Sequence, residues 1–211
     1  MIISLTGFMG CGKSSVGRRL SQLLCCTFMD LDVEIEARAG RTIAEIFDND
    51  GEAEFRRIEQ DTLSAVIRGW REGMPGQSLP SQATGPSLCG QRGSTVPSSP
   101  LSSHSTSAHS LILALGGGAV MTAGSAEMVH EGTMCIYMKA SVETLINHLS
   151  GETSGRPLLN CSDSGTSVLR NRILELMSLR AETYERTAHH IIDTDGKTID
   201  DIAQEIILLL Q

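Results

Sequence analysis

The sequence predicts an α/β protein in which helices flank a five-stranded parallel sheet, as a single domain over residues 1–211. Five short apolar runs alternate with segments of helical period, which is the pattern of a doubly wound sheet. The first run leads directly into a glycine-rich loop and then a helix. With 40% hydrophobic residues, a chain of 211 residues can bury one good core.

The first three elements are predicted as strand, helix and strand. "IISL" is a short apolar run of β type. "SSVGRRLSQLL" repeats valine and leucine at helical spacing, which predicts a helix. "CTFMDLD" predicts a second strand that closes with Asp30 and Asp32. Because side chains alternate along a strand, these two acids are expected to share one face of an extended segment.

Three helices are predicted next. "VEIEARAG" and "TIAEIFDNDG" are short, and Thr42 with Glu45 forms a capping box at the start of the second. "GEAEFRRIEQDTLSAVIRG" carries large apolar residues at helical period and predicts a longer helix.

Residues 70–110 then change composition abruptly to serine, glycine and proline with few large apolar side chains. Such a segment cannot bury enough surface to offset its ordering entropy, so it is predicted to be a flexible, disordered insertion. Its His104 and His109 are expected to face solvent, since no acid or thiol is spaced with them for metal binding.

The remaining elements resume sharply after the insertion. The strands expected here are "LILAL", "TMCIYMK" and "HHIIDT". The helices expected between and after them are "TAGSAEMVHEG", "SVETLINHL", "SVLRNRILELMSLRAETYERTA" and "TIDDIAQEIILLL". Residues 150–162, which precede the longest of these helices, are predicted to be a polar, glycine-rich loop. The strand "LILAL" is apolar throughout, as expected for a strand buried on both faces, and it runs into "GGGAV".

Composition narrows the function classes. The formal net charge of -8, from 17 basic and 25 acidic residues, argues against holding nucleic acid by bulk electrostatics. The amino terminus lacks the pattern of a signal peptide, and no apolar run approaches a membrane span. The six cysteines show no CxxC pair, which favours reduced thiols over a metal site or a disulfide frame. A cytoplasmic protein without a nucleic-acid or membrane partner is expected.

The most specific motif is "GFMGCGKSS", which matches GxxxxGK[ST] between a predicted strand and a predicted helix. Glycines let backbone N–H groups converge on phosphate oxygens, and the helix N-terminus adds its positive end. Lys13 is expected to reach the β- and γ-phosphates, and Ser14 to place its hydroxyl on Mg²⁺. Cys11 is interpreted as a small filler of the loop. The phosphate donor is therefore predicted to be ATP with one Mg²⁺ ion.

Three features indicate an acceptor site at the carboxyl ends of the strands, where a doubly wound sheet places its ligands. They are the acids Asp30 and Asp32, the glycines Gly116 to Gly118, and Arg56 on the intervening helix. Bare backbone at the three glycines could approach a small polar ligand closely. A solvated helix cap for the acids and a surface position for Arg56 are the alternatives at this point.

Two further arginines are unremarkable by spacing alone. Arg156 in "GRPLL" lies between glycines that could act as hinges, and a closing loop could bring its guanidinium over ATP. Arg180 in "SLRAETYERTA" reads as an ordinary helix residue.

Taken in order, the motifs resemble the shikimate kinase family over nearly all the chain except the insertion. They are "GFMGCGKSS", "FMDLD", "IAEIFDNDGEAEFRRIE", "LALGGGAV", "GRPLL" and "RAETYERTA". The resemblance implies the P-loop fold of nucleoside monophosphate kinases. It also implies transfer of phosphate from ATP to the 3-hydroxyl of shikimate, on the pathway to chorismate and the aromatic amino acids, by a monomer.

On the donor side, the resemblance implies that Lys13 and Arg156 act in catalysis and bind ATP. Ser14 and Asp30 would hold the metal. The ATP-binding loop would comprise Gly10, Cys11, Gly12, Lys13, Ser14 and Ser15.

On the acceptor side, Asp32 would bind the ring hydroxyls and orient, or deprotonate, the attacking one. Arg56 and Arg180 would clamp the carboxylate, and Gly116, Gly117 and Gly118 would line the ring. Guanidinium forks suit a carboxylate, and a carboxylate acceptor suits hydroxyls. Positioning and charge neutralisation would then carry the in-line transfer.

The chain departs from the family pattern in two places. A basic residue often precedes the lid in the family, and His148 is a weak substitute for it; residues 195–197 are a candidate adenine contact. The insertion is the larger departure, and it is expected to emerge at the amino edge of the sheet, opposite the ligands. Deleting residues 73–107 is therefore expected to leave catalysis largely intact.

Two alternatives are kept. Another P-loop small-molecule kinase, for gluconate or a nucleoside monophosphate, would share the phosphate loop, but the paired acids, Arg56 and the triple glycine argue against it. An inactive nucleotide-binding module would be expected to lose its functional residues, and all are present: Lys13, Asp32, Arg56 and Arg156.

Overall fold

The computed structural model describes residues 1–73, 110–149 and 166–211. Most of the predicted insertion, with His104 and His109, lies outside these ranges, as does the predicted lid loop with Arg156.

The five predicted strands form one parallel sheet, which confirms the fold class. The strands are β1 (Ile2–Thr6), β2 (Thr27–Asp30), β3 (Leu111–Ala114), β4 (Met134–Lys139) and β5 (His190–Asp193). Their spatial order is β2-β3-β1-β4-β5, with every neighbouring pair parallel. The order reverses at β1, so the loop after β1 opens at the switch point of the sheet.

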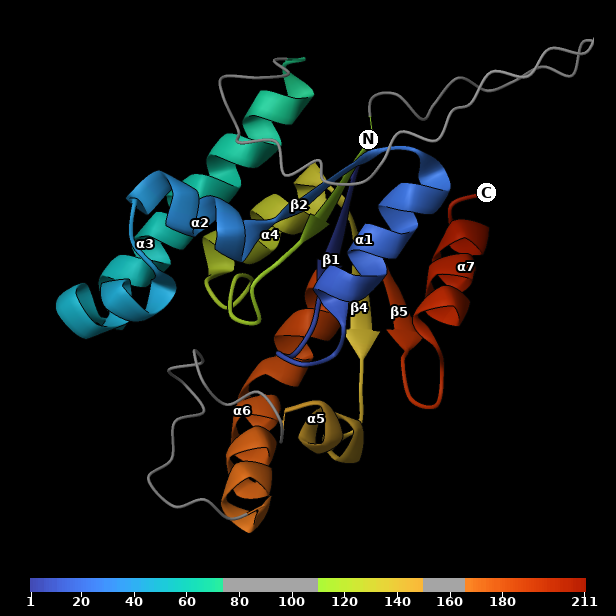
Figure 1. Ribbon diagram of the computed structural model, residues 1–211. Helices are drawn as coiled ribbons and strands as arrows, with labels where there is room; N and C mark the ends of the chain where they lie inside the picture. The colour runs from blue at the N-terminus through green and yellow to red at the C-terminus, as the bar shows by residue number, and fades with distance from the viewer. Residues whose placement is uncertain (74–109, 150–165) are drawn as a thin grey trace, which may run out of the picture.

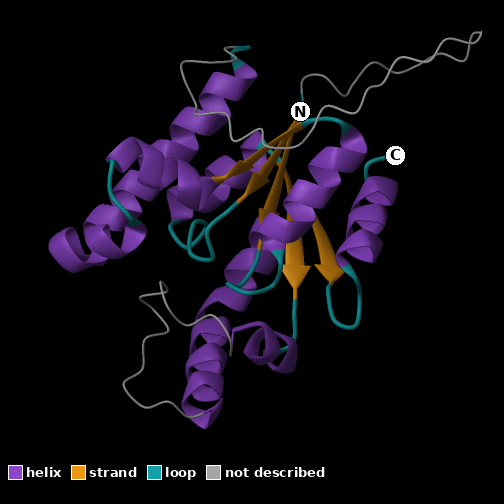
Figure 2. Cartoon of the chain, in the orientation of Figure 1, coloured by secondary structure: helices purple, strands orange, loops and turns teal. Residues whose placement is uncertain are grey.

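Helices cover both faces of the sheet (Figures 1 and 2). They are α1 (Lys13–Leu24), α2 (Leu31–Ala39), α3 (Ile43–Arg71), α4 (Ala123–Gly132), α5 (Val142–Leu149), α6 (Thr166–Thr187) and α7 (Ile199–Leu209). Helices α1 and α7 pack together on one face, while α4 and α6 lie on the other. Helices α2 and the first half of α3 project beside β2 as a separate lobe.

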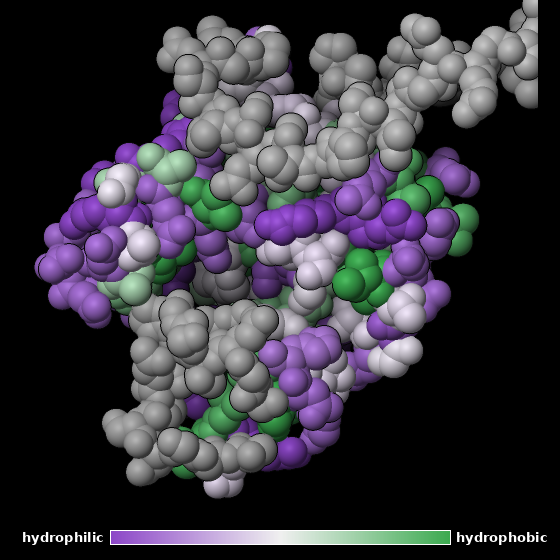
Figure 3. Space-filling view, in the orientation of Figure 1, coloured by the Kyte–Doolittle hydropathy of each residue, from purple (hydrophilic) through white to green (hydrophobic). Residues whose placement is uncertain are grey.

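Two apolar clusters, one on each face, explain why the strands are nearly continuous apolar runs. Val16 of α1 and Ile202 of α7 belong to the first cluster, with Ile3, while Val129 of α4 and Tyr184 of α6 belong to the second. All four residues of β3 are buried. A parallel strand covered on both faces needs apolar side chains in both directions. On the face seen in Figure 3, the coloured surface is mainly hydrophilic.

The carboxyl ends of β1, β2 and β3 meet at one edge of the sheet, because neighbouring parallel strands start and end together. The loop from Gly7, the acid Asp30 and the turn from Leu115 follow these three ends. At the opposite edge α3 ends at Arg71 and β3 begins at Leu111 (Figure 1). The described residues that flank the insertion thus lie away from the loop edge.

The prediction that Asp32 lies in a strand is wrong. Strand β2 ends at Asp30, whose carboxylate accepts a hydrogen bond from the backbone N–H of Asp32 at 3.1 Å. That bond makes Asp30 the N-cap of α2, so Asp32 falls in the first helical turn. The capping bond is favoured over continuation of the strand because the first N–H groups of a helix have no backbone partner and need a side-chain acceptor.

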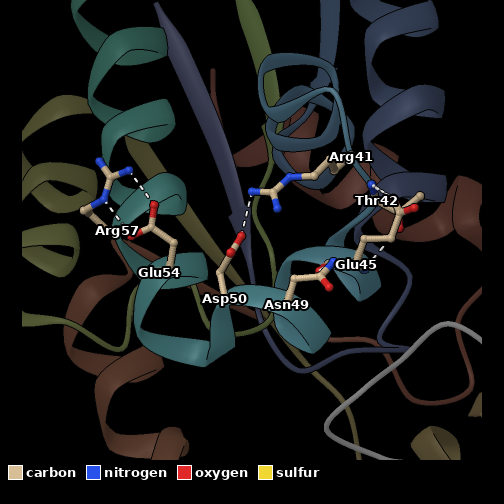
Figure 4. A network of polar contacts seen from close by, with 7 residues as sticks. All are labelled: Arg41, Thr42, Glu45, Asn49, Asp50, Glu54 and Arg57. Atoms are coloured by element: carbon tan, nitrogen blue, oxygen red, sulfur yellow. Dashed lines mark hydrogen bonds and ion pairs between the residues drawn. The ribbon is translucent and has the colours of Figure 1, made fainter.

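The two helices predicted on either side of Gly51 run into one another as α3, which is broken at Gly51. The predicted capping box at Thr42 is confirmed: Glu45 N donates to the Thr42 hydroxyl, and the Glu45 carboxylate accepts from Thr42 N at 2.8 Å (Figure 4).

Candidate active site

A cleft of about 1070 Å³ lies at the carboxyl edge of the sheet. Nearly all the residues predicted for the site line it. They are Gly10, Cys11, Gly12, Lys13, Ser14, Ser15, Asp30, Asp32, Arg56, Gly116, Gly117, Gly118 and Arg180. The structure thus brings together residues from α1, α2, α3, α6 and the loops after β1 and β3, and the cleft is large enough for a nucleotide beside a small acid. Arg156 lies outside the described residues.

The loop after β1 turns on three glycines with positive φ: Gly7 at 142°, Gly10 at 82° and Gly12 at 91°. A Cβ on Gly7 would come within 2.6 Å of the Met138 carbonyl oxygen, so the loop needs glycine there for space as well as for conformation. Gly12 caps α1 with no side-chain hydrogen bond, so the first N–H groups of the helix are left for a ligand.

Lys13 is buried inside this loop. Its ammonium donates to the Gly7 carbonyl at 3.0 Å and to the Phe8 carbonyl at 2.9 Å, and it lies 3.7 Å from the Cys11 sulfur. The loop carbonyls therefore hold the cation in place among the N–H groups. A positive charge so placed favours a bound anion at the start of α1.

Ser14 and Asp30 form a pair of oxygen groups beside the loop. The Ser14 hydroxyl donates to Asp30 Oδ2 at 2.6 Å, while the other oxygen of Asp30 caps α2. Among the described residues, no cluster of three or more histidine, cysteine or acidic side chains could hold a metal ion. A cation bound here would take one hydroxyl and one carboxylate oxygen from the protein.

Asp32 is an acid in an environment that disfavours its charge. Burial raises the pKa of Asp32 to about 6, and the neighbouring charge of Asp30 adds to the rise, while Lys13 and Arg56 oppose it. A carboxylate with a pKa near neutrality can accept a proton from a substrate at physiological pH. Gly116 makes room for this carboxylate, because a Cβ there would lie 2.6 Å from Asp32 Oδ1.

Arg56 is held by two acids of its own helix. Its guanidinium donates to Glu59 Oε2 at 2.6 Å and to Glu52 Oε1 at 3.2 Å, and its side chain is only 17% exposed. The alternative of an ordinary surface position is therefore wrong. The guanidinium lies against the glycine turn: a Cβ on Gly118 would come within 2.4 Å of Arg56 Nη1.

Arg180 reaches the same turn from α6. It is buried, and Nη1 donates to the Gly117 carbonyl at 3.4 Å. The Tyr184 hydroxyl donates to the same carbonyl oxygen. Two guanidinium groups from distant parts of the chain thus converge on consecutive glycines, which is the geometry needed to hold one carboxylate between them.

Two features of the cleft were missed by the sequence predictions. Glu59 is 3% exposed, and burial raises its pKa, with Asp32 adding to the rise and Arg56 and Arg180 opposing it. A signal existed, because Glu59 falls on the apolar stripe of α3 between Phe55 and Leu63. The second feature is an aromatic wall formed by Phe47 and Phe55, whose ring centroids are 4.7 Å apart.

The far end of the cleft includes His148 and Lys197. His148 Nδ1 makes a hydrogen bond with the Gly10 carbonyl at 2.8 Å, which places its ring against the phosphate loop. Of the stretch 195–197, Lys197 lines the cleft, whereas the Asp195 carboxylate accepts from the Ser141 backbone N–H at 3.0 Å.

Two bulk predictions can also be compared with the structure. The four cysteines in its described part, Cys11, Cys25, Cys26 and Cys135, are free thiols. None of the described helices is both long and apolar enough to cross a membrane.

Comparison with known proteins gives a consistent result. A sequence model of the shikimate kinase family matches residues 9–70 and 100–211. The shikimate kinase of Salinibacter ruber is 31% identical, over 98% of this chain and 83% of that protein. The shikimate kinase of Caldanaerobacter subterraneus is 32% identical, over 97% of this chain and 93% of that protein. A solved shikimate kinase from Acinetobacter baumannii, in complex with shikimate, is 28% identical with a TM-score of 0.74, covering 99% of this chain and 92% of the other.

Proposed function

The chain belongs to the shikimate kinase family and uses ATP to phosphorylate the 3-hydroxyl of shikimate, and from this premise we propose how its residues divide the reaction. The products are shikimate 3-phosphate and ADP, on the pathway to chorismate and the aromatic amino acids. The observation that carries the assignment of roles is that Asp32, Arg56 and Arg180 share one cleft with Lys13.

The donor end is assigned to the loop Gly10–Ser15, whose N–H groups bind the phosphates of ATP. Lys13 is already directed into the loop by the Gly7 and Phe8 carbonyls, so little reorganisation is needed for it to meet the β- and γ-phosphates. Thr194, Lys197 and Thr198 line the same cleft and are assigned to the remainder of the nucleotide.

The metal site is assigned to Ser14 and Asp30. A hydroxyl oxygen beside a carboxylate oxygen suits Mg²⁺, which binds through one or two protein oxygens and keeps most of its waters. When bound, the ion neutralises charge on the transferred phosphoryl group. Asp30 holds one side of this site rigidly because it also caps α2.

The acceptor end is assigned to Asp32, Arg56 and Arg180. The two guanidinium groups bind the carboxylate of shikimate, while the glycine turn 116–118 lies against the ring. Asp32 orients the attacking hydroxyl and takes its proton, for which its raised pKa of about 6 is suited. Glu59 holds Arg56 in the orientation this requires.

The remaining roles rest on the family resemblance. Arg156 in "GRPLL" is proposed as the lid residue on the transferred phosphate, within a lid of residues 150–162. We also propose that the enzyme works as a cytoplasmic monomer; the four free thiols in the described ranges are compatible with a reducing compartment.

A coupled ADP-release assay tests the function. Purified protein is given Mg-ATP with shikimate, quinate, gluconate or AMP as acceptor. Shikimate-dependent release is expected, because two guanidinium groups and one carboxylate fit a hydroxylated ring acid. Robust release with gluconate or AMP and none with shikimate would instead assign the chain to the other P-loop kinases.

A further inference from the structure

Helix α3 is broken at Gly51, whose φ of 82° and ψ of 174° lie far from helical values. This combination of angles is open essentially only to glycine. A Cβ built on Gly51 would meet no heavy atom of the described residues within 4 Å. The backbone conformation, and not crowding, therefore requires glycine at this position.

The break brings together two aromatic residues that a continuous helix would separate. Phe47 and Phe55 are eight residues apart, which is about 12 Å along a regular helix axis. Their ring centroids are instead 4.7 Å apart, with an interplanar angle of 37°. Both rings line the cleft, and the Phe55 ring lies 5.1 Å from the guanidinium carbon of Arg56. The aromatic wall of the acceptor pocket thus exists because the helix is broken.

Arginine side chains hold the chain on both sides of the break (Figure 4). Arg41, which precedes α3, donates from Nη2 to Asp50 Oδ2 at 2.7 Å, immediately before Gly51. Glu54 follows the break and is bonded to Arg57 at 2.6 Å. The pKa of Glu54 is lowered by the hydrogen bond from Arg57 and also by the charge of Arg41. Arg41 therefore attracts acids on both sides of Gly51.

We propose that Gly51 and Arg41 are positioning residues for shikimate: Arg41 holds the angle of the Gly51 break, and the break sets the wall of Phe47 and Phe55 beside Arg56. The proposal rests on the proposed function, because it concerns how that acceptor is seated. Neither residue lines the cleft, so both act through the aromatic pair. The phosphate loop lies between β1 and α1, so it is not part of the broken helix and is expected to keep its structure when the break changes.

Gly51→Ala is the first test, with KM for shikimate, KM for ATP and Tm measured together. Alanine cannot keep these angles, so the rings separate and KM for shikimate is expected to rise about 10- to 100-fold. KM for ATP is expected to stay within about twofold. The matched control is Gly73→Ala, two residues beyond the last residue of α3, where φ is 68° and a Cβ would also meet no described heavy atom within 4 Å. That control is expected to leave both KM values unchanged.

Arg41→Gln is the second test. This variant is expected to fold, because the Arg41 side chain is 41% exposed. KM for shikimate is expected to rise about threefold to tenfold, with partial recovery in Arg41→Lys, which keeps the charge but not the fork. The double variant Gly51→Ala/Arg41→Gln is expected to be no worse than Gly51→Ala alone, because both changes act through one break.

The outcomes separate cleanly. A normal KM for shikimate in Gly51→Ala and Arg41→Gln, or equal rises in both KM values, overturns the positioning role. A purely structural role would lower Tm without a selective change in KM. Wild-type protein in the same assay keeps the proposed function distinct, since absence of shikimate-dependent ADP release there is a failure of that function and not of the Gly51 device.

Discussion

Asp32 illustrates how a single residue acquires its chemistry from its neighbours. Its carboxylate is half-buried beside Asp30, and both the burial and the neighbouring charge raise its pKa, to about 6. Lys13 and Arg56 are close enough to oppose the rise, so the acid stays within reach of ionisation at neutral pH. A proton acceptor of this strength is matched to a hydroxyl nucleophile that must lose its proton during transfer.

Replacing Asp32 by asparagine tests this role. Asp32→Asn is expected to abolish turnover while leaving ATP binding nearly intact, because the donor end of the cleft is untouched. Turnover is measured by ADP release, and ATP binding by calorimetry. Normal turnover in this variant would contradict the acceptor assignment.

The same variant has a consequence for stability. A carboxyl with a raised folded-state pKa favours folding at low pH, and this contribution is lost as pH rises through about 6. Asp32→Asn is therefore expected to raise the free energy of unfolding at pH 7 by on the order of 3 kcal/mol, and Tm with it, and to change Tm little near pH 4. Thermal unfolding at the two pH values measures the difference. A lower Tm of the variant at pH 7 would show that the charged Asp32 carboxylate does not destabilise the folded protein.

The pH profile gives an independent test. With Asp32 as the base, kcat/KM for shikimate is expected to fall as pH drops through about 6, because the protonated acid cannot accept the hydroxyl proton. The measurement is made at saturating Mg-ATP from pH 5 to 8. A flat profile through pH 6 would remove Asp32 from proton transfer.

At the scale of elements, the turn after β3 is where three side chains of the proposed acceptor site meet. Asp32 comes from α2, Arg56 from α3 and Arg180 from α6, and each lies against one of the glycines 116–118. The turn has no side chains of its own, which is what allows charged groups from three helices to approach so closely. The Tyr184 hydroxyl fixes the turn by donating a hydrogen bond to the Gly117 carbonyl oxygen.

Gly116→Ala tests the need for bare backbone in this turn. The new Cβ would lie 2.6 Å from Asp32 Oδ1 and 3.0 Å from Glu59 Oε1, so Asp32 must move. A displacement of this size is expected to lower kcat/KM for shikimate about 100-fold, with ATP affinity unchanged. Gly69→Ala is the control, since its Cβ would meet no described heavy atom within 4 Å and alanine favours a helix. Similar kinetics for the two variants would contradict the crowding at Gly116.

At the scale of the whole molecule, the cleft contains basic side chains withdrawn from solvent although the chain carries a net charge of -8. Lys13, Arg56 and Arg180 are all partly or fully buried there. In the proposed function, two anionic substrates are held by a few directed groups rather than by the net charge of the chain.

The position of the insertion is also a property of the whole fold. Its described flanks, the end of α3 and the start of β3, lie at the sheet edge opposite the cleft (Figure 1), and the family model leaves residues 71–99 unmatched. Deletion of residues 73–107 is therefore expected to preserve kcat and both KM values within about threefold. A large loss of turnover in a folded deletion variant, as judged by circular dichroism, would place the insertion at the active site.

Much of this protein could be predicted from the sequence because the deciding contacts are local. The phosphate loop is built from bonds that span few residues, such as Lys13 to Gly7 and Phe8, and the inner strands β1, β3 and β4 are apolar runs because both their faces are covered. Local patterns gave a wrong prediction at Asp32, which lies in a capped helix and not in a strand. They also missed Glu59, a buried charged residue on the apolar stripe of its helix.

The sequence by itself determined the sheet, the phosphate loop and the residue types of the site, since periodicity, glycine positions and motif spacing are written along the chain. Only the tertiary structure decided that Arg56 and Arg180 converge on one glycine turn, that burial raises the pKa of Asp32, and that a break at Gly51 joins Phe47 to Phe55. For the arginines and for Asp32 the reason is that desolvation and charge coupling depend on distances between segments that lie far apart in the chain, which no local pattern encodes. At Gly51 the reason is that the sequence shows a glycine but not the backbone angles that it adopts.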